Sequence, residues 1–104
     1  MRRSEARQRH SSGNVFRDLG FAGHEAEHLL VRSSLMLRVE REIKRRKLTQ
    51  AAAAKLLGVS QPRVSDLHRG RIDLFSSDAL IDMLARLGVR VRVIAQGSGR
   101  RKVA

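Results

Sequence analysis

The segment from residue 50 to residue 69, QAAAAKLLGVSQPRVSDLHR, constrains the fold more than any other part of the chain. It has the pattern of two short helices joined by a tight turn. Gly58 follows the last apolar residue of the first helix, where a residue in the left-handed conformation would end that helix. Thr49 and Ser60 precede the two helices as predicted N-caps. Pro62 falls in the first turn of the second helix, where its missing N–H costs nothing.

The apolar positions of the two predicted helices indicate which sides face each other. Ala53, Ala54 and Leu57 share one face of the first helix. Val64 and Leu67 share one face of the second helix. Because both faces should be buried, the segment is predicted to be a helix-turn-helix, whose second helix lies in the major groove of duplex DNA.

The polar side chains on the outer side of the second helix are the candidate DNA-reading groups. Glutamine and arginine make paired hydrogen bonds to the edges of adenine and guanine. The predicted base-reading residues are Gln61, Arg63 and Ser65. The predicted phosphate contacts come from polar and basic residues in and around the motif: Thr49, Gln50, Lys55, Ser60, Arg69 and Arg71.

The net charge agrees with a nucleic-acid partner. The 104 residues include 22 Lys and Arg against 10 Asp and Glu, which gives a formal net charge of +12 at pH 7. Such an excess is typical of proteins that bind a polyanion. The chain has three Phe and no Trp or Tyr, which disfavours base stacking and therefore single-stranded nucleic acid. Double-stranded DNA is the expected partner.

Other function classes receive little support. The chain has no cysteine, so a disulfide framework and thiolate metal sites are excluded. No apolar run is long enough to span a membrane. The basic N-terminus is followed by Ser-Ser-Gly rather than by an apolar core, so it does not resemble a secretory signal. We expect a cytoplasmic protein that is associated with the nucleoid and has no membrane partner.

Residues 24–28 read His-Glu-Ala-Glu-His, which matches the H-E-x-x-H pattern of zinc proteases. On a helix, His24 and His28 would share one face, one turn apart. However, Gly23 precedes the pattern immediately, no third ligand is signalled nearby, and a chain of 104 residues leaves little for a substrate cleft. We therefore expect a solvated helix start here, and a protein without metal, cofactor, catalytic residues or enzymatic activity.

The periodicity elsewhere predicts a compact all-α DNA-binding domain of four to five helices at residues 31–96. Leu35, Val39 and Ile43 recur every four residues in a long amphipathic helix from about residue 28 to residue 47. A further helix is predicted after the motif from apolar residues at helical spacing: Leu80, Met83, Leu84 and Leu87.

Residues 89–95 change to strict alternation and are predicted to form a β-strand. A lone strand cannot satisfy its ladder hydrogen bonds, and the sequence offers no second strand. We expect the strand to pair across a homodimer, with Val89, Val91 and Val93 on its covered face. The alternative is an unpaired extended tail. A dimer would place two recognition helices about one DNA turn apart, so the operator is expected to be an inverted repeat.

The segments outside this domain are predicted from composition. Residues 1–13 are expected to be a disordered basic arm, and residues 97–104 a disordered basic tail. Residues 14–30 are an apolar and acidic segment that either covers part of the core or binds a partner. Its apolar cluster consists of Val15, Phe16, Leu19 and Phe21.

The helix-turn-helix segment resembles that of the XRE family, the Cro and cI repressor-like DNA-binding proteins. The resemblance is carried by the residues Thr49, Gln50, Ala54, Gly58, Val59, Val64 and Leu67. In that family the glutamine at the position of Gln50 commonly contacts the DNA backbone.

A longer stretch, residues 11–95, resembles HigA-type antitoxins. The matching runs include GNVFRDLGF at 13–21, RSSLM at 32–36 and DLFSSDALIDMLARLGVRVRV at 73–93. The resemblance implies an antitoxin that neutralises a RelE/HigB-like mRNA endonuclease toxin and represses its own operon. It implies toxin contacts at Val15, Phe16, Leu19 and Phe21. The alternative is a stand-alone XRE-type transcriptional regulator without a toxin partner.

Overall fold

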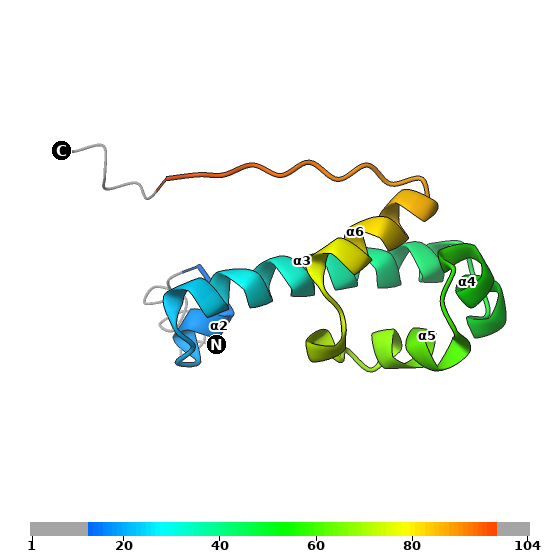
Figure 1. Cartoon of the computed structure of the whole chain (residues 1–104), viewed down its shortest axis with the longest axis horizontal. Helices are drawn as coiled ribbons and strands as arrows, with labels where there is room; N and C mark the ends of the chain where they lie inside the picture. The colour runs from blue at the N-terminus through cyan, green and yellow to red at the C-terminus, as the bar shows by residue number, and fades with distance from the viewer. Residues whose placement is uncertain (1–12, 98–104) are drawn as a thin grey trace, which may run out of the picture.

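The computed structural model describes residues 13–97, which contain five α-helices and one short 3-10 helix. The elements are α2 (Val15–Asp18), α3 (Gly23–Arg45), α4 (Gln50–Leu57), α5 (Gln61–His68), η1 (Ile72–Leu74) and α6 (Ser77–Arg86). α3 is the long central rod (Figure 1). The other helices group around its C-terminal part, except α2, which lies at its N-terminal end. The all-α fold with five helices is therefore confirmed. The predicted basic arm and tail fall, for residues 1–12 and 98–104, outside the described residues.

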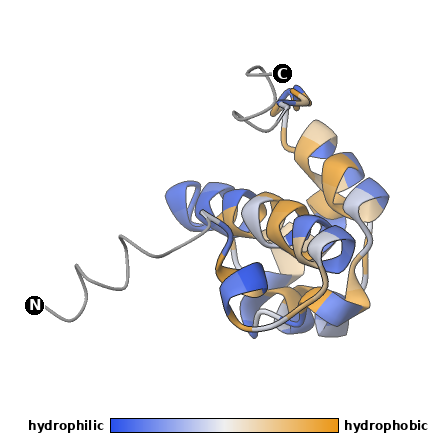
Figure 2. Ribbon diagram, turned by 90° about the vertical axis from the view of Figure 1, so that its left-hand side faces the viewer, coloured by the Kyte–Doolittle hydropathy of each residue, from blue (hydrophilic) through white to orange (hydrophobic). Residues whose placement is uncertain are grey.

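The hydrophobic core lies where the C-terminal part of α3 meets α4, α5, η1 and α6. Figure 2 shows that these helices carry both polar and apolar residues, as expected for helices that bury one face. The apolar faces predicted from the periodicity are buried, and only Leu35 lies partly exposed at the edge. The core residues are Met36, Val39, Ile43, Ala53, Ala54, Leu57, Val64, Leu67, Phe75, Leu80, Met83, Leu84 and Leu87.

The long helix α3 begins earlier than its periodicity predicts, at Gly23 rather than near His28. The reason is α2, which folds back onto the first turns of α3 and fully buries Ala26. Asn14 caps α2, since its side-chain oxygen accepts from the backbone N–H of Phe16 at 2.9 Å. The amide of Asn14 also donates to Glu27 on α3 at 3.2 Å. Residues 14–30 thus form a helical hairpin on the end of α3, away from the main core.

The predicted strand at residues 89–95 is not confirmed. No strand is formed within residues 13–97. The chain after α6 runs extended, back along α3 toward the end where α2 lies (Figure 1). Val89 and Val91 pack against the core of their own chain, whereas Val93 is 84% exposed. The described part of the chain contains no second strand for a ladder. The alternation of buried and exposed residues instead comes from packing of Val89 and Val91 against the helices.

Glu42, near the C-terminal end of α3, contacts three arginines, and one of them, Arg46, also reaches the end of α6. Its side chain is only 6% exposed and accepts hydrogen bonds from Arg45 at 2.7 Å and from Arg38 at 3.2 Å. Arg46 lies 3.4 Å from the same carboxylate and donates to the backbone carbonyl of Leu87. The hydrogen bond from Arg45, supported by that from Arg38, holds the pKa of Glu42 below its ordinary value of 4.5, against the opposing effect of burial.

This cluster predicts an acid-dependent loss of stability. A carboxyl whose pKa is lowered by folding stabilises the folded state above its unfolded pKa, and this contribution is lost as the pH falls through the folded pKa. We therefore expect the urea midpoint to fall as the pH drops below 4.5, and Glu42→Gln to lower the midpoint at neutral pH and flatten this acid dependence. Glu25→Gln, at an exposed position on the same helix, is the control and should change the midpoint much less than Glu42→Gln. A Glu42→Gln profile parallel to that of the unmodified protein would contradict the role of the cluster.

Candidate nucleic-acid interface

The helix-turn-helix is built from the local signals that its sequence carries. The hydroxyl of Thr49 accepts from the backbone N–H of Ala52 at 3.0 Å and caps α4. Gly58 ends α4 in the left-handed conformation, with φ of 72°. The hydroxyl of Ser60 accepts from the backbone N–H of Arg63 at 3.4 Å and caps α5. Both predicted caps and the predicted turn are confirmed.

A residue distant in sequence also lies against the turn. A Cβ atom added to Gly58 would lie 3.0 Å from Nη1 of Arg86 on α6. The Arg86 side chain is held there beside Asp82, with Nε 3.1 Å from the carboxylate. Gly58 is therefore favoured by its positive φ, whereas the exposed end of the flexible Arg86 side chain could shift to admit a Cβ. The glycine could be predicted from the turn, but its neighbour on α6 could not.

The N-terminal ends of α4 and α5 present polar residues to solvent. Gln50 and Gln61 each occupy the first position of their helix and are exposed. Lys55 is exposed on α4 and has no acidic partner among residues 13–97. Ser65 lies one turn after Gln61 and is half-buried. The free backbone N–H groups of helix N-termini attract phosphate, so these ends suit the approach of a duplex.

Arg69 and Arg71 lie at the C-terminal end of α5 and in the loop that follows. Arg69 pairs with Asp66 at 2.7 Å, and Arg71 pairs with Asp73 at 3.5 Å. Both arginine side chains are exposed. Exposed ion pairs contribute little stability, so either arginine can exchange its carboxylate for a phosphate at small cost.

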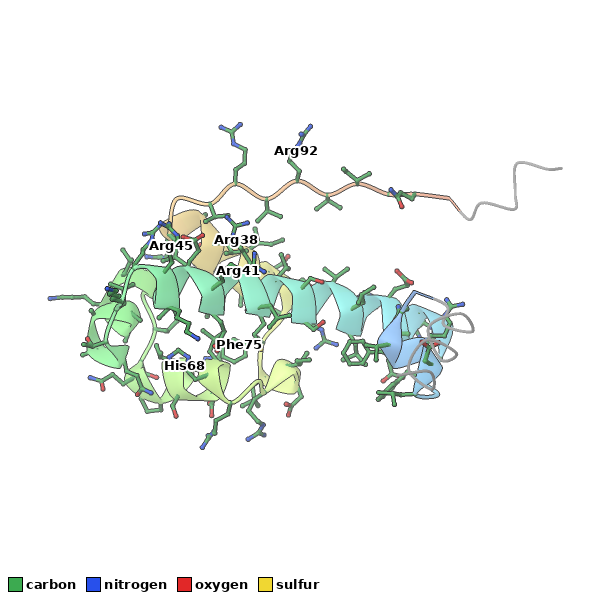
Figure 3. The ribbon with its side chains drawn as sticks, turned by 180° about the vertical axis from the view of Figure 1, so that it is seen from behind. Arg38, Arg41, Arg45, His68, Phe75 and Arg92 are labelled. Atoms are coloured by element: carbon green, nitrogen blue, oxygen red, sulfur yellow. The ribbon has the colours of Figure 1, made fainter. Side chains whose placement is uncertain are left out.

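Arg63 has a different environment from the other predicted base readers. Its guanidinium lies 4.1 Å from the centroid of the Phe75 ring, and its Nη1 donates to the backbone carbonyl of Leu74 at 2.8 Å. Phe75 itself is 1% exposed and lies between α3 and the layer of α5 and η1 (Figure 3). The Arg63 side chain is therefore turned toward the segment between η1 and α6. Gln61, in contrast, is exposed as expected.

A second unpredicted contact holds the other end of α5. Nδ1 of His68 lies 3.1 Å from a carboxylate oxygen of Glu40 on α3. The two side chains are about one-third exposed. With Arg63 near the start of α5 and His68 at its end, α5 has a polar contact to another part of the chain near each end, while Val64 and Leu67 are buried in its middle.

The H-E-x-x-H pattern lies at the start of α3, where His24 and His28 are exposed. Within residues 13–97, no three His, Cys, Asp or Glu side chains come together as a metal-binding group. None of the helices in the same range is long and apolar enough to cross a membrane.

Comparison with known proteins extends these observations to the whole domain. Residues 15–96 match the model of the HTH_37 family, which is described as a helix-turn-helix domain. A solved structure described as belonging to the XRE family of transcriptional regulators is similar to this chain, with 33% sequence identity and a TM-score of 0.68. The match covers 73% of this chain and 85% of that one. No curated protein matches the sequence. The chain belongs to the HTH_37 family of helix-turn-helix domains and is of the XRE type.

Proposed function

We propose that this protein is a transcriptional regulator that binds duplex DNA sequence-specifically with α5 in the major groove. The observation that carries the proposal is the two-sided character of α5. Val64 and Leu67 are each 1% exposed and fix the helix to the core, while Gln61 is exposed at its N-terminal end. The family membership of residues 15–96 supports the same function. The proposed activity is binding, without a chemical step, and its location would be the nucleoid.

The proposed mechanism combines electrostatic capture with base readout. Neutralisation of phosphates by basic side chains releases counterions and gives affinity that falls with salt. The phosphate contacts are assigned to Thr49, Gln50, Lys55, Ser60, Arg69 and Arg71. The base contacts are assigned to Gln61 and Ser65. Arg63, the third predicted base reader, would reach a base only after leaving Phe75 and the carbonyl of Leu74.

Footprinting on the promoter of the protein's own gene tests this function. We expect a protected inverted repeat that is bound about a thousandfold or more tightly than random duplex DNA. The logarithm of affinity should fall linearly with the logarithm of salt concentration. Equal affinity for the promoter and for random DNA would contradict sequence-specific regulation.

The inverted repeat follows from a proposed homodimer formed through residues 89–95. The support is the extended chain in this segment and the exposure of Val93 and Ile94, 84% and 72%. Val89 and Val91 already pack on their own core, so pairing would use the backbone edge and Val93 rather than all three predicted valines. Sedimentation equilibrium of the full chain measures the dimer directly.

We further propose that the protein is an antitoxin whose toxin binds the hairpin formed by α2 and the start of α3. Three of the four predicted toxin contacts are exposed apolar residues: Val15 is 55% exposed, Leu19 70% and Phe21 40%. The ring of Phe16 packs edge-on against that of Phe21, with 6.1 Å between the ring centroids. The hairpin lies at the opposite end of α3 from α4 and α5 (Figure 1). A protein partner on the hairpin would therefore leave the DNA-binding helices accessible.

The toxin contact is tested with two exposed leucines. Leu19→Glu on the hairpin is expected to abolish binding of a RelE/HigB-like protein encoded beside this gene, because the partner would have to desolvate a carboxylate. Leu37→Glu, at a 63% exposed position farther along α3, should leave binding intact. The measurements are co-purification of the co-expressed pair and protection of mRNA from cleavage. Failure of the unmodified protein to bind such a toxin would favour the stand-alone regulator, which fits the family membership equally well.

A further inference from the structure

Arg63 connects the start of the recognition helix to the segment that leads into α6. It is the third residue of α5, and its backbone N–H is the one that Ser60 caps. Its side chain bridges to the carbonyl of Leu74 at the end of η1 and to the ring of Phe75. Ser76, the next residue, caps α6 through the backbone N–H of Ala79. One side chain therefore links the N-terminal turn of α5 to the residues that immediately precede α6.

A base contact by Arg63 would require these interactions to be broken. The guanidinium would lose its stacking on an aromatic face, and the carbonyl of Leu74 would lose the donor that the structure gives it. The combined loss is of the same order as the gain from a paired hydrogen bond to a base. Reading a base with Arg63 therefore brings little net affinity, whereas Gln61 is exposed and need not give up such contacts.

The present position of Arg63 still leaves it able to contact DNA. A guanidinium has five N–H donors, and the hydrogen bond to Leu74 uses Nη1. Arg63 is half-buried rather than enclosed, and it lies in the first turn of α5, where helix N-termini face phosphates. Stacking on Phe75 holds the guanidinium plane in place, which suits a fixed contact to a phosphate oxygen.

We propose that Arg63 is a positioning residue rather than a base reader. It remains stacked on Phe75 in the DNA complex, fixes the angle of the N-terminal turn of α5, and donates its remaining N–H groups to a backbone phosphate. Base selection then falls to Gln61 and Ser65. This inference rests on the proposed function, because it presumes that α5 lies in the major groove.

The test is to select binding sites from a randomised operator with the unmodified protein, Arg63→Ala, Arg63→Lys and Gln61→Ala, and to measure affinity for operator and random duplexes. We expect Arg63→Ala to weaken both affinities, that for the operator somewhat more because the turn carrying Gln61 is held less firmly, to lower the salt slope by about 1, and to leave the preferred base at every position unchanged. Arg63→Lys should restore the salt slope but not the full affinity, because lysine keeps the charge and loses the planar stacked donor. Gln61→Ala is the positive control and should relax one position.

A second comparison asks whether Arg63 acts through Phe75. Phe75→Leu removes the aromatic face while keeping an apolar side chain, and its folding is checked by thermal melting. We expect the double variant with Arg63→Ala to bind DNA no more weakly than the weaker single variant. Relaxed selection at one base pair in Arg63→Ala would overturn the inference and leave the proposed function standing. An unmodified protein that selects no sequence would overturn the proposed function and this inference with it.

Discussion

Replacement of Gln61 by alanine is expected to lower affinity for the operator by roughly 5- to 150-fold per recognition helix, with little change in affinity for random duplex DNA. This range corresponds to the loss of about 1–3 kcal/mol from one paired contact to a base. Gln61 is exposed at the first position of α5, and the cap of that helix is made by Ser60 instead. The substitution should therefore remove a DNA contact and leave the fold intact. Gel-shift titration on both DNAs, with circular dichroism for the fold, measures the effect.

The chain provides a matched control for this substitution. Gln50 occupies the first position of α4, follows the N-cap Thr49, and is also exposed. Because Gln50 is assigned to a phosphate, Gln50→Ala should weaken binding to operator and random DNA equally. Similar losses on both DNAs for Gln61→Ala would contradict its role as a base reader. If only Gln50→Ala lost the preference for the operator, the base-reading glutamine would be on α4 rather than on α5.

The largest expected effect on stability comes from Leu57, the last residue of α4. Leu57 is 1% exposed and belongs to the core cluster that joins α3 to the motif helices and α6. Leu57→Ala removes buried methyl groups and leaves a cavity, which costs about 2–5 kcal/mol. Domains of this size have a total stability of about 5–15 kcal/mol. We therefore expect a large fall in the urea midpoint, and DNA binding that is lost at lower temperature than in the unmodified protein.

The neighbouring residue provides the control for Leu57. Leu56 has the same side chain on the same helix but is 38% exposed. Leu56→Ala should lower the unfolding free energy by much less, because its partly solvated site collapses without a cavity. Urea unfolding of both variants with equal slopes makes the comparison direct. A loss from Leu56→Ala as large as that from Leu57→Ala would contradict the assigned packing of α4.

The parts of the fold predicted correctly are those specified within one or two helical turns. The caps at Thr49 and Ser60 each involve a backbone N–H three residues away. The left-handed turn at Gly58 is a property of that one residue. The buried faces of the helices follow from their 3.6-residue period. Such signals can be read without knowledge of the rest of the structure.

The predicted start of α3 is wrong, and the predicted strand at residues 89–95 is not confirmed. Both features depend on packing against distant parts of the chain. α3 begins at Gly23 since α2 buries Ala26, which the periodicity of α3 alone does not reveal. The alternation after residue 88 fits a strand, but within the described chain it is satisfied by packing Val89 and Val91 on the core. An alternation of apolar and polar residues indicates that one side of an extended segment is buried. It does not indicate whether a strand or a group of helices buries that side.

The sequence by itself determined a basic, all-α chain with a helix-turn-helix, together with the residues that cap and face its two helices. Only the tertiary structure decided how α5 is held. Arg63 meets Phe75, and His68 meets Glu40, across separations of 12 and 28 residues. Arg86 on α6 likewise lies against Gly58 in the turn between α4 and α5. The physical reason is that caps, turns and periodicity act through neighbouring backbone groups, whereas these side-chain contacts exist only after the helices have packed.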